Sequence, residues 1–255
     1  MIIIKNSYDI KKMKEVCKLT ADVLDFIKKY ISPGISTEEI NKICHNYIVN
    51  KKKSIPACLG YQGYPKSICV SLNNVVCHGI PNKKIILKNG DILNIDISLI
   101  KNNYFGDSSK MFMVGKCSHI AKKLCKVTLE SLYSSIKIIK PGINLNKIGK
   151  TIEKIAKKNN FSVVQEYCGH GIGKNFHEEP YVLHYNEKKQ NIILQKGMIF
   201  TIEPMINAGK RNIFCDKDNW TVKTKDNSLS AQYEHTILVT ENGYEVLTLR
   251  KKEKI

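Results

Sequence analysis

The sequence has no long apolar run, no paired-cysteine motif and almost no arginine. No stretch approaches the roughly 20 apolar residues that a membrane-spanning helix needs, and the apolar start Ile2–Ile4 is too short for a signal peptide. The nine cysteines are odd in number, irregularly spaced and without a Cys-x-x-Cys pair, which argues against a disulfide framework or a structural zinc site. We therefore expect reduced thiols, no membrane partner and a cytoplasmic location.

The scarcity of arginine also limits what the positive charge of the chain can mean. There are 41 basic and 23 acidic residues, for a net charge of +18, but only Arg211 and Arg250 are arginines. Such an excess favours polyanionic partners such as RNA, whereas arginine is the residue best suited to bidentate phosphate and base contacts. Two interpretations stay open: a real polyanionic partner, or a lysine-rich coding bias displayed on a solvated surface.

What the sequence does contain is a repeated helix plan. Apolar residues at helical spacing predict a helix over Ser7–Tyr30. Ser36 and Glu39 have the spacing of a capping box and predict the start of a second helix. A third helix is predicted over about 118–139, and apolar residues from Ile148 onward predict a fourth.

Two Pro-Gly-Ile units join these helix pairs at equivalent places. They begin at Pro33 and Pro141, an offset of 108 residues, and each helix pair leads into strand-like sequence. The pattern predicts a duplicated α+β domain. Because nothing between the halves resembles a flexible linker, we expect one domain over 1–255, with an internal pseudo-twofold that relates halves of about 1–117 and 118–255.

Carboxylates lie within predicted strands of the first half. Asp96 and Asp107 belong to two alternating strands that a turn at Lys101-Asn102 joins into a hairpin. With that turn, Asp96 lies directly opposite Asp107. If the register is shifted by two residues, the two side chains are diagonal neighbours on the same face. A three-residue loop without a bulge would instead place them on opposite faces. Like charges that face each other destabilise a strand pair unless a proton or a cation lies between them. The first half therefore indicates a metal.

The second half repeats this anomaly. Glu203 and Glu234 each lie in an apolar run, and Glu203 follows Asp96 by 107 residues, nearly the repeat offset. We expect the four carboxylates to meet between the halves, together with His170, which glycines flank. A single one would more often belong to a buried salt bridge, but four with an imidazole suit two divalent ions such as Mn, Fe, Co or Zn. Two such ions activate a water and clamp a tetrahedral intermediate, which predicts hydrolysis.

Seven short motifs occur along the chain: Pro56-Ala57-Cys58-Leu59-Gly60-Tyr61, Gly63-Tyr64-Pro65-Lys66-Ser67, Val76-Cys77-His78-Gly79-Ile80-Pro81, Gly169-His170-Gly171-Ile172-Gly173, His177-Glu178-Glu179-Pro180, Thr201-Ile202-Glu203-Pro204 and Ser230-Ala231-Gln232-Tyr233-Glu234-His235-Thr236. They resemble the motifs of bacterial type I methionine aminopeptidases, from about residue 5 to residue 250. The resemblance implies the pita-bread fold, a pseudo-symmetric α+β domain in which helices flank antiparallel sheet. It also implies a monomer that removes the initiator methionine from nascent proteins when the second residue is small.

The resemblance further implies roles for single residues. The metal ligands would be Asp96, Asp107, His170, Glu203 and Glu234. Asp107 and Glu234 would bridge two divalent ions, which could be Co, Mn, Fe, Zn or Ni, and Glu203 would also act as the general acid/base for the bridging water.

The substrate site follows from the same resemblance. His177 would hydrogen-bond the scissile carbonyl and stabilise the oxyanion, and His78 would position the substrate amide and assist proton transfer; either would otherwise be an ordinary loop histidine. The residues implied to bind substrate are Cys58, Tyr61, Tyr64, Cys69, His78, Phe176, His177 and Trp220, and those implied to bind a monovalent cation are Asn73, Val75 and Ser230. Gln62 departs from the family, many members of which carry histidine there, so affinity or the pH profile is open to change.

Two other hypotheses stay open. A proline-directed pita-bread peptidase such as a prolidase would share the ligands but is disfavoured by the short chain. A pita-bread protein that has lost catalysis and acts at the ribosome or on RNA would be expected to lack a ligand, whereas all five are present. An enzyme that acts on nascent chains works beside ribosomal RNA, so the basic surface also fits transient ribosome association.

Overall fold

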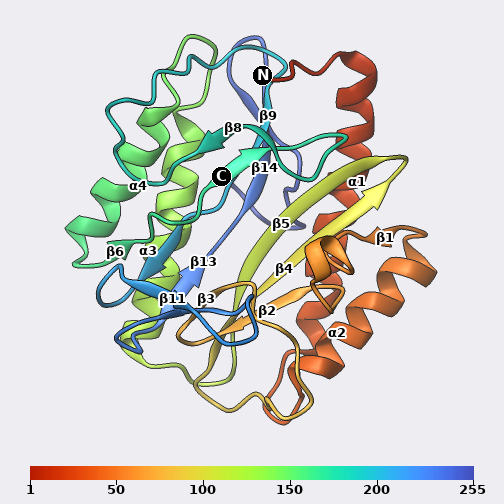
Figure 1. Ribbon diagram of the computed structural model, residues 1–255, viewed down its shortest axis with the longest axis vertical. Helices are drawn as coiled ribbons and strands as arrows, with labels where there is room; N and C mark the ends of the chain where they lie inside the picture. The colour runs from red at the N-terminus through yellow and green to blue at the C-terminus, as the bar shows by residue number, and fades with distance from the viewer.

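Long helices and short antiparallel sheets make up the protein, as a computed structural model of all 255 residues shows (Figure 1). The helical elements are α1 (Ser7–Ile27), η1 (Lys28–Tyr30), α2 (Thr37–Asn46), η2 (Tyr47–Lys51), η3 (Tyr61–Gly63), α3 (His119–Lys137) and α4 (Asn146–Lys158). The strands are β1 (Ile55–Pro56), β2 (Cys69–Leu72), β3 (Val75–Cys77), β4 (Ile92–Lys101), β5 (Tyr104–Met113), β6 (Ser162–Val163), β7 (Gly169–Gly171), β8 (Glu178–Val182), β9 (Ile199–Ile202), β10 (Met205–Asn207), β11 (Ile213–Cys215), β12 (Val222–Thr224), β13 (Ser230–Gln232), β14 (His235–Val239) and β15 (Tyr244–Val246).

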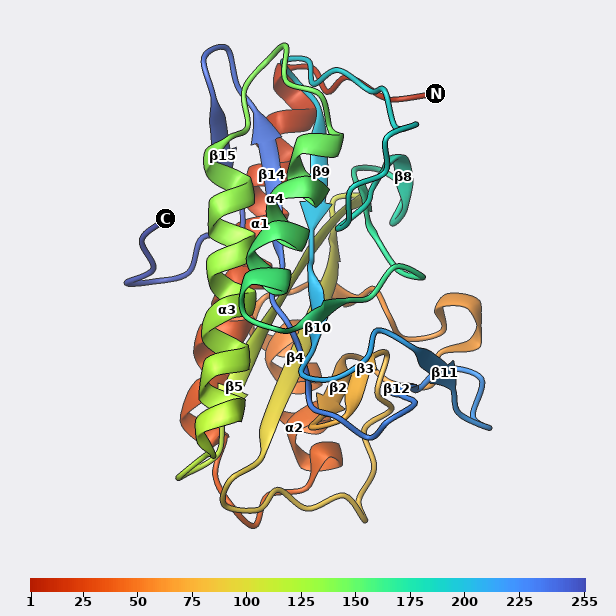
Figure 2. The same ribbon diagram turned by 90° about the vertical axis from the view of Figure 1, so that its left-hand side faces the viewer.

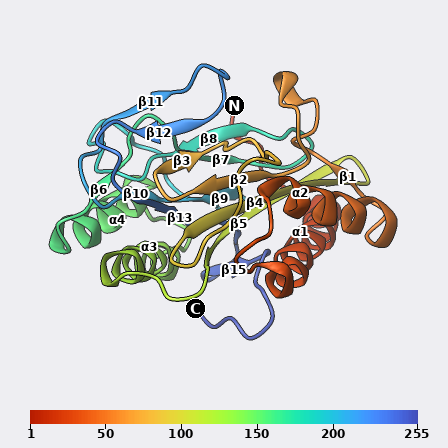
Figure 3. The ribbon, with the colours of Figure 1, turned by 90° about the horizontal axis from the view of Figure 1, so that it is seen from below.

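The helices cover one side of the sheets, and short strands with loops lie on the other side (Figures 2 and 3). α1 packs on β4 and β5, while α3 and α4 pack on each other, α3 also on β10 and β13. Figures 2 and 3 show this layering, with β8, β11 and β12 on the side away from α3 and α4. The cores of the two halves lie between helices and sheets, and none of the helices has the length and apolarity needed to span a bilayer.

Each half is built around one central strand. β5 pairs with β4 along its whole length, so β1 and β2 share the other edge of β4. In the second half β9 lies between β14 and β7, in the order β15-β14-β9-β7-β8. β4 and β9 begin 107 residues apart, at Ile92 and Ile199, which matches the offset predicted from the carboxylates.

The two Pro-Gly-Ile units make the same contacts in their respective halves. Gly34 N donates to Leu87 O at 2.9 Å and Leu87 N donates to Ile35 O at 2.9 Å. The equivalent bonds join Gly142 to Leu194 at 2.9 Å and Leu194 to Ile143 at 2.8 Å. Both glycines have positive φ, +96° and +85°, a conformation that side chains with a Cβ rarely adopt. The pseudo-twofold relation and the α+β fold class predicted from this spacing are confirmed.

The predicted helices form close to their expected bounds. Asn6 and Ser36 both make complete capping boxes, the second with Glu39 as predicted. Ser118 caps α3 by accepting a hydrogen bond from Ala121 N. All nine cysteines are free thiols, in agreement with the sequence.

The hairpin register differs from the first prediction. The turn lies at Asn102-Asn103 rather than at Lys101-Asn102, and both asparagines have positive φ, 52° and 63°. Asparagine tolerates that conformation, and a two-residue turn of this kind matches the twist of the flanking strands. Asp107 therefore pairs with Ser98, so its predicted direct opposition to Asp96 is wrong and the diagonal arrangement on one face holds.

Candidate metal centre and the cavity around it

The five residues predicted as metal ligands line one cavity of about 420 Å³. They lie on β4 (Asp96), on β5 (Asp107), on β7 (His170), directly after β9 (Glu203) and between β13 and β14 (Glu234). The two glutamates are thus not within strands, as the apolar runs had suggested, but at strand ends. The sheets of both halves therefore contribute side chains to one site.

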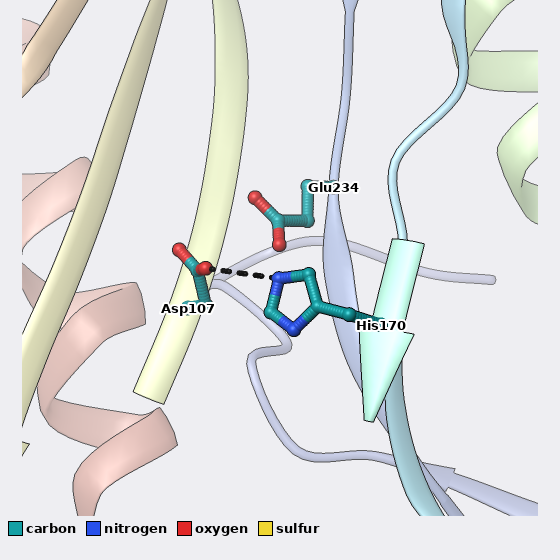
Figure 4. Close-up of side chains that lie close together, drawn as sticks. All are labelled: Asp107, His170 and Glu234. Carbon is teal, nitrogen blue, oxygen red and sulfur yellow. Dashed lines mark ion pairs between the residues drawn. The ribbon is translucent and has the colours of Figure 1, made fainter. Parts of the chain in front are cut away.

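The imidazole of His170 lies at the centre of this group. Its Nδ1 is 3.0 Å from the carbonyl oxygen of Gly171, which can only accept, so Nδ1 carries the proton and Nε2 has a free lone pair. Nε2 lies 3.7 Å from Asp107 Oδ2 and 3.7 Å from Glu203 Oε1. One ligand atom each of Asp107, His170 and Glu234 lie within 4.8 Å of one another (Figure 4). Burial lowers the pKa of His170 to about 3, so the ring is neutral and its lone pair faces carboxylate oxygens.

The carboxylates are also electrostatically uncompensated. Burial and the charge of Asp107 raise the pKa of Glu203 to about 8, and burial raises the pKa of Asp107 to about 6. Burial and the charge of Asp107 likewise raise the pKa values of Asp96 and Glu234. Asp96 Oδ1 and Glu234 Oε1 are buried without a hydrogen-bond partner. Acceptor atoms therefore face one another with no hydrogen-bond donor between them. Such an arrangement suits a divalent cation of the kind that oxygen and imidazole ligands bind.

Neighbouring polar side chains fix the orientation of the carboxylates. Ser98 Oγ donates to Asp107 Oδ1 at 2.9 Å. Thr201 Oγ1 donates to Glu203 Oε1 at 2.9 Å, and Gln232 Nε2 donates to Glu203 Oε2 at 3.2 Å. None of these three was predicted as a site residue, although strand alternation places Ser98 on the same face as Asp96 and could have identified it.

Aromatic and sulfur-containing side chains form the other part of the cavity. All the residues predicted to bind substrate line it: Cys58, Tyr61, Tyr64, Cys69, His78, Phe176, His177 and Trp220. Tyr64 and Trp220 meet edge to face with ring centroids 5.1 Å apart, and Tyr61 and Phe176 do so at 5.0 Å. Lining residues that were not predicted include Cys77, Tyr167, Cys168 and Met205. The cavity therefore joins an apolar, sulfur-rich compartment to a cluster of carboxylates.

The two predicted catalytic histidines face this cavity as neutral rings. His177 Nδ1 lies 2.9 Å from the hydroxyl of Tyr61, and its ring centroid is 4.2 Å from that of His170. His78 has a positive φ of 55° and lies edge to face against Trp220 and Tyr167. Burial lowers the pKa of His177 and lowers that of His78 to about 4. Gln62 is exposed at the cavity, and its Nε2 is 3.4 Å from the hydroxyl of Tyr61.

The residues predicted for a monovalent cation lie outside this cavity. Ser230 N donates to the carbonyl oxygen of Asn73 at 2.8 Å, so these two are adjacent. Val75 begins β3, two residues after Asn73. The Asn73 side chain already accepts from Ile92 N at 3.1 Å and donates to Asp91. The monovalent cation stays a prediction.

Comparison with known proteins gives full-length matches. Residues 11–241 match the family described as metallopeptidase family M24. The chain is 64% identical over 253 residues to a methionine aminopeptidase of Buchnera aphidicola subsp. Acyrthosiphon pisum, covering 99% of this chain and 96% of that one. It is 58% identical over 254 residues to the methionine aminopeptidase of Escherichia coli strain K12, with coverage of 100% and 96%.

Solved structures of known proteins are also similar to this chain. The methionine aminopeptidase of Rickettsia prowazekii superposes with a TM-score of 0.95 at 48% identity, covering 98% of this chain and all of that one. The prolidase of Pyrococcus horikoshii shares the fold with a TM-score of 0.77 at 23% identity, and the match spans 66% of that longer chain.

Proposed function

The chain belongs to metallopeptidase family M24. We propose that the five acceptor side chains that line its cavity would hold two divalent ions, to both of which Asp107 and Glu234 would be ligands. The reaction is hydrolytic removal of the N-terminal methionine from new polypeptides, as in the methionine aminopeptidases that share 58–64% of its residues. One observation carries the metal assignment: the lone pair of His170 Nε2 faces carboxylate oxygens at 3.7 Å with no hydrogen between them. Co, Mn, Fe, Zn and Ni all suit this ligand set.

When bound, such ions supply the Lewis acidity that lowers the pKa of a water and polarises a carbonyl group. Glu203 is the residue that takes the proton from the attacking water and returns it to the leaving amine. Hydrogen bonds from Thr201 and Gln232 hold both of its oxygens, so its orientation is set before substrate arrives. Because the carboxylate of Glu203 is already oriented, it needs no change of rotamer before it takes the proton.

The two neutral histidines act on the peptide group. When the Tyr61 hydroxyl donates to His177 Nδ1, Nε2 of His177 carries its proton and can donate to the scissile carbonyl oxygen, whose negative charge grows during attack. His78 lies beside Trp220 at the same cavity and holds the substrate amide. The thioether of the substrate methionine fits among Cys58, Cys69 and the aromatic rings, because sulfur makes favourable contacts with ring edges.

The experiment compares two peptides. Metal-free protein is mixed with Mn²⁺, Co²⁺ or Fe²⁺ and assayed for methionine release from Met-Ala-Ser and Met-Leu-Ser. We expect release from the first peptide and much slower release from the second. Absence of release from Met-Ala-Ser with every metal would refute the reaction, and equal rates on both peptides would refute the small-second-residue rule.

We extend the proposal to a cytoplasmic monomer that associates transiently with the ribosome. Exposed lysines line two adjoining grooves along α3 and α4. Figure 2 shows these two helices on the side away from β8, β11 and β12. The lysines are Lys137, Lys140, Lys147, Lys150, Lys154 and Lys158, and none pairs with a carboxylate. Elsewhere some lysines pair, as Lys14 does with Glu245 at 2.7 Å, while others such as Lys83 and Lys84 are exposed and unpaired. The gathering of six lysines along two adjoining grooves, rather than their lack of partners, favours an RNA partner over uniform coding bias.

Salt dependence and a matched charge control test this association. One variant replaces Lys147, Lys150, Lys154 and Lys158 by glutamine, and the control replaces the exposed, unpaired Lys83, Lys84, Lys88 and Lys116. We expect ribosome binding to weaken steeply with salt and to fall much more in the first variant. Equal losses would leave net charge alone as the explanation, and binding that ignores salt would contradict an electrostatic association.

A further inference from the structure

One of the two arginines of the chain is buried behind the candidate metal centre. Arg250 follows β15 and is only 3% exposed, whereas Arg211 lies on the surface. A buried guanidinium is costly unless its hydrogen bonds and charge are compensated. Nε of Arg250 is buried without a hydrogen-bond acceptor in the protein, so its other donors carry the contacts of the guanidinium.

The guanidinium contacts the strand that carries Asp107. Nη1 of Arg250 donates to Ser108 Oγ at 3.0 Å and to Ser109 O at 3.4 Å. Ser108 Oγ in turn donates to the main-chain carbonyl of Glu234 at 2.7 Å. Glu234 N donates to Ser109 O at 3.1 Å. Two hydrogen bonds through Ser108, the residue that follows Asp107, therefore link Arg250 to the backbone of Glu234.

The other side of the guanidinium reaches the segment after Glu234. Nη2 of Arg250 lies 3.1 Å from His235 Nε2 and donates to Glu253 Oε1 at 2.8 Å. Thr248 Oγ1 accepts from Thr236 N at 3.0 Å. Thr236 Oγ1 donates to the carbonyl oxygen of Asp107 at 2.7 Å, which links the segment after Glu234 back to β5.

Lysine could not make this set of contacts. Only the planar fork of arginine offers donors in two fixed directions at once, toward β5 and toward the segment after Glu234.

We propose that Arg250 is a positioning residue, which holds the backbones of Asp107 and Glu234 at a fixed separation and so sets the affinity of the centre for its metal ions. The inference rests on the proposed metal site. It assigns a function to the C-terminal segment 248–253, none of whose residues lines the catalytic cavity.

The test measures metal binding by metal-free protein rather than turnover alone. Mn²⁺ affinity is determined by calorimetry and the Co²⁺ absorption spectrum is recorded for Arg250→Met, Arg250→Lys and Ser108→Ala, with Arg211→Met as the matched control. We expect Arg250→Met and Ser108→Ala to lower Mn²⁺ affinity about 10- to 100-fold and to alter the Co²⁺ bands, as loss of an outer hydrogen-bond partner does in other metal sites. Arg250→Lys should recover part of the affinity, and Arg211→Met should leave it unchanged.

Kinetics at saturating metal separate positioning from substrate contact. KM for Met-Ala-Ser should stay within about twofold in Ser108→Ala, because neither Ser108 nor Arg250 touches the cavity. Ser108→Ala also answers the question if Arg250→Met fails to fold, since it removes only the connecting hydroxyl. Parental Mn²⁺ affinity and Co²⁺ spectrum in Ser108→Ala would overturn the proposal. Absence of Mn²⁺ binding by the unmodified protein would instead refute the metal site itself.

Discussion

Replacing Glu203 by glutamine should remove a pH dependence from the stability of the metal-free protein. Burial and the charge of Asp107 raise the pKa of Glu203 from 4.5 to about 8. Between these two values the folded protein keeps a proton on Glu203 that the unfolded chain has lost. The free energy of unfolding therefore falls as pH rises through this range, and the loss is complete only above the folded pKa.

The size of the effect follows from the shift. Each pKa unit corresponds to about 1.4 kcal/mol, so the whole range accounts for roughly 5 kcal/mol, of which about 2 kcal/mol is lost between pH 6.5 and 8.5. Buried histidines titrate over part of the same range in the unfolded chain, but they do so equally in the parent and in Glu203→Gln. The difference between the two proteins therefore reports Glu203 together with Asp96 and Glu234, whose pKa values its charge raises.

Urea unfolding in the presence of EDTA measures this difference. We expect Glu203→Gln to gain about 2 kcal/mol of stability relative to the parent between pH 6.5 and pH 8.5. Parallel pH profiles, with a constant difference between the two proteins, would refute the conclusion that Glu203 is protonated when the site holds no cation.

Further predictions concern the loaded site and the substrate. Metal binding at pH 7 should release at least about one proton per protein, because a carboxyl with a pKa of about 8 must ionise to bind; calorimetry in buffers of different ionisation enthalpy counts the protons, and none released would contradict the electrostatics. Glu203→Ala should lower kcat about 100-fold or more with Mn²⁺ at saturation, and near-parental turnover would refute its role as general base. His177→Ala should lower kcat/KM for Met-Ala-Ser by about 10- to 100-fold, whereas Tyr61→Phe, which removes only the hydroxyl on Nδ1, should cost less; equal losses would argue against carbonyl binding through Nε2.

Much of the fold followed from local sequence signals. The capping box at Ser36 and the Pro-Gly-Ile units at Pro33 and Pro141 depend on neighbouring residues, so they could be identified before any tertiary contact was known. The hairpin register could not, because Lys101-Asn102 and Asn102-Asn103 are both plausible two-residue turns. The turn forms at Asn102-Asn103, because both asparagines adopt the left-handed conformation that this type of turn requires.

The site residues likewise include some that the local sequence identified and others that only the folded chain reveals. Carboxylates in apolar runs are anomalies that one sequence displays, and they led to Asp96, Asp107, Glu203 and Glu234. Arg250 could not be found like this, because its partners Ser108 and His235 are 142 and 15 residues away and nothing in their local sequence is unusual. Supporting contacts between distant segments become visible only when the chain is folded.

We propose that two divalent ions lie between the two halves of the protein. Anomalous diffraction from crystals of the Mn²⁺-loaded protein tests it most directly. We predict two peaks, with Asp107 and Glu234 shared by both and His170 Nε2 coordinating one. A single peak, or peaks away from these residues, would contradict the account.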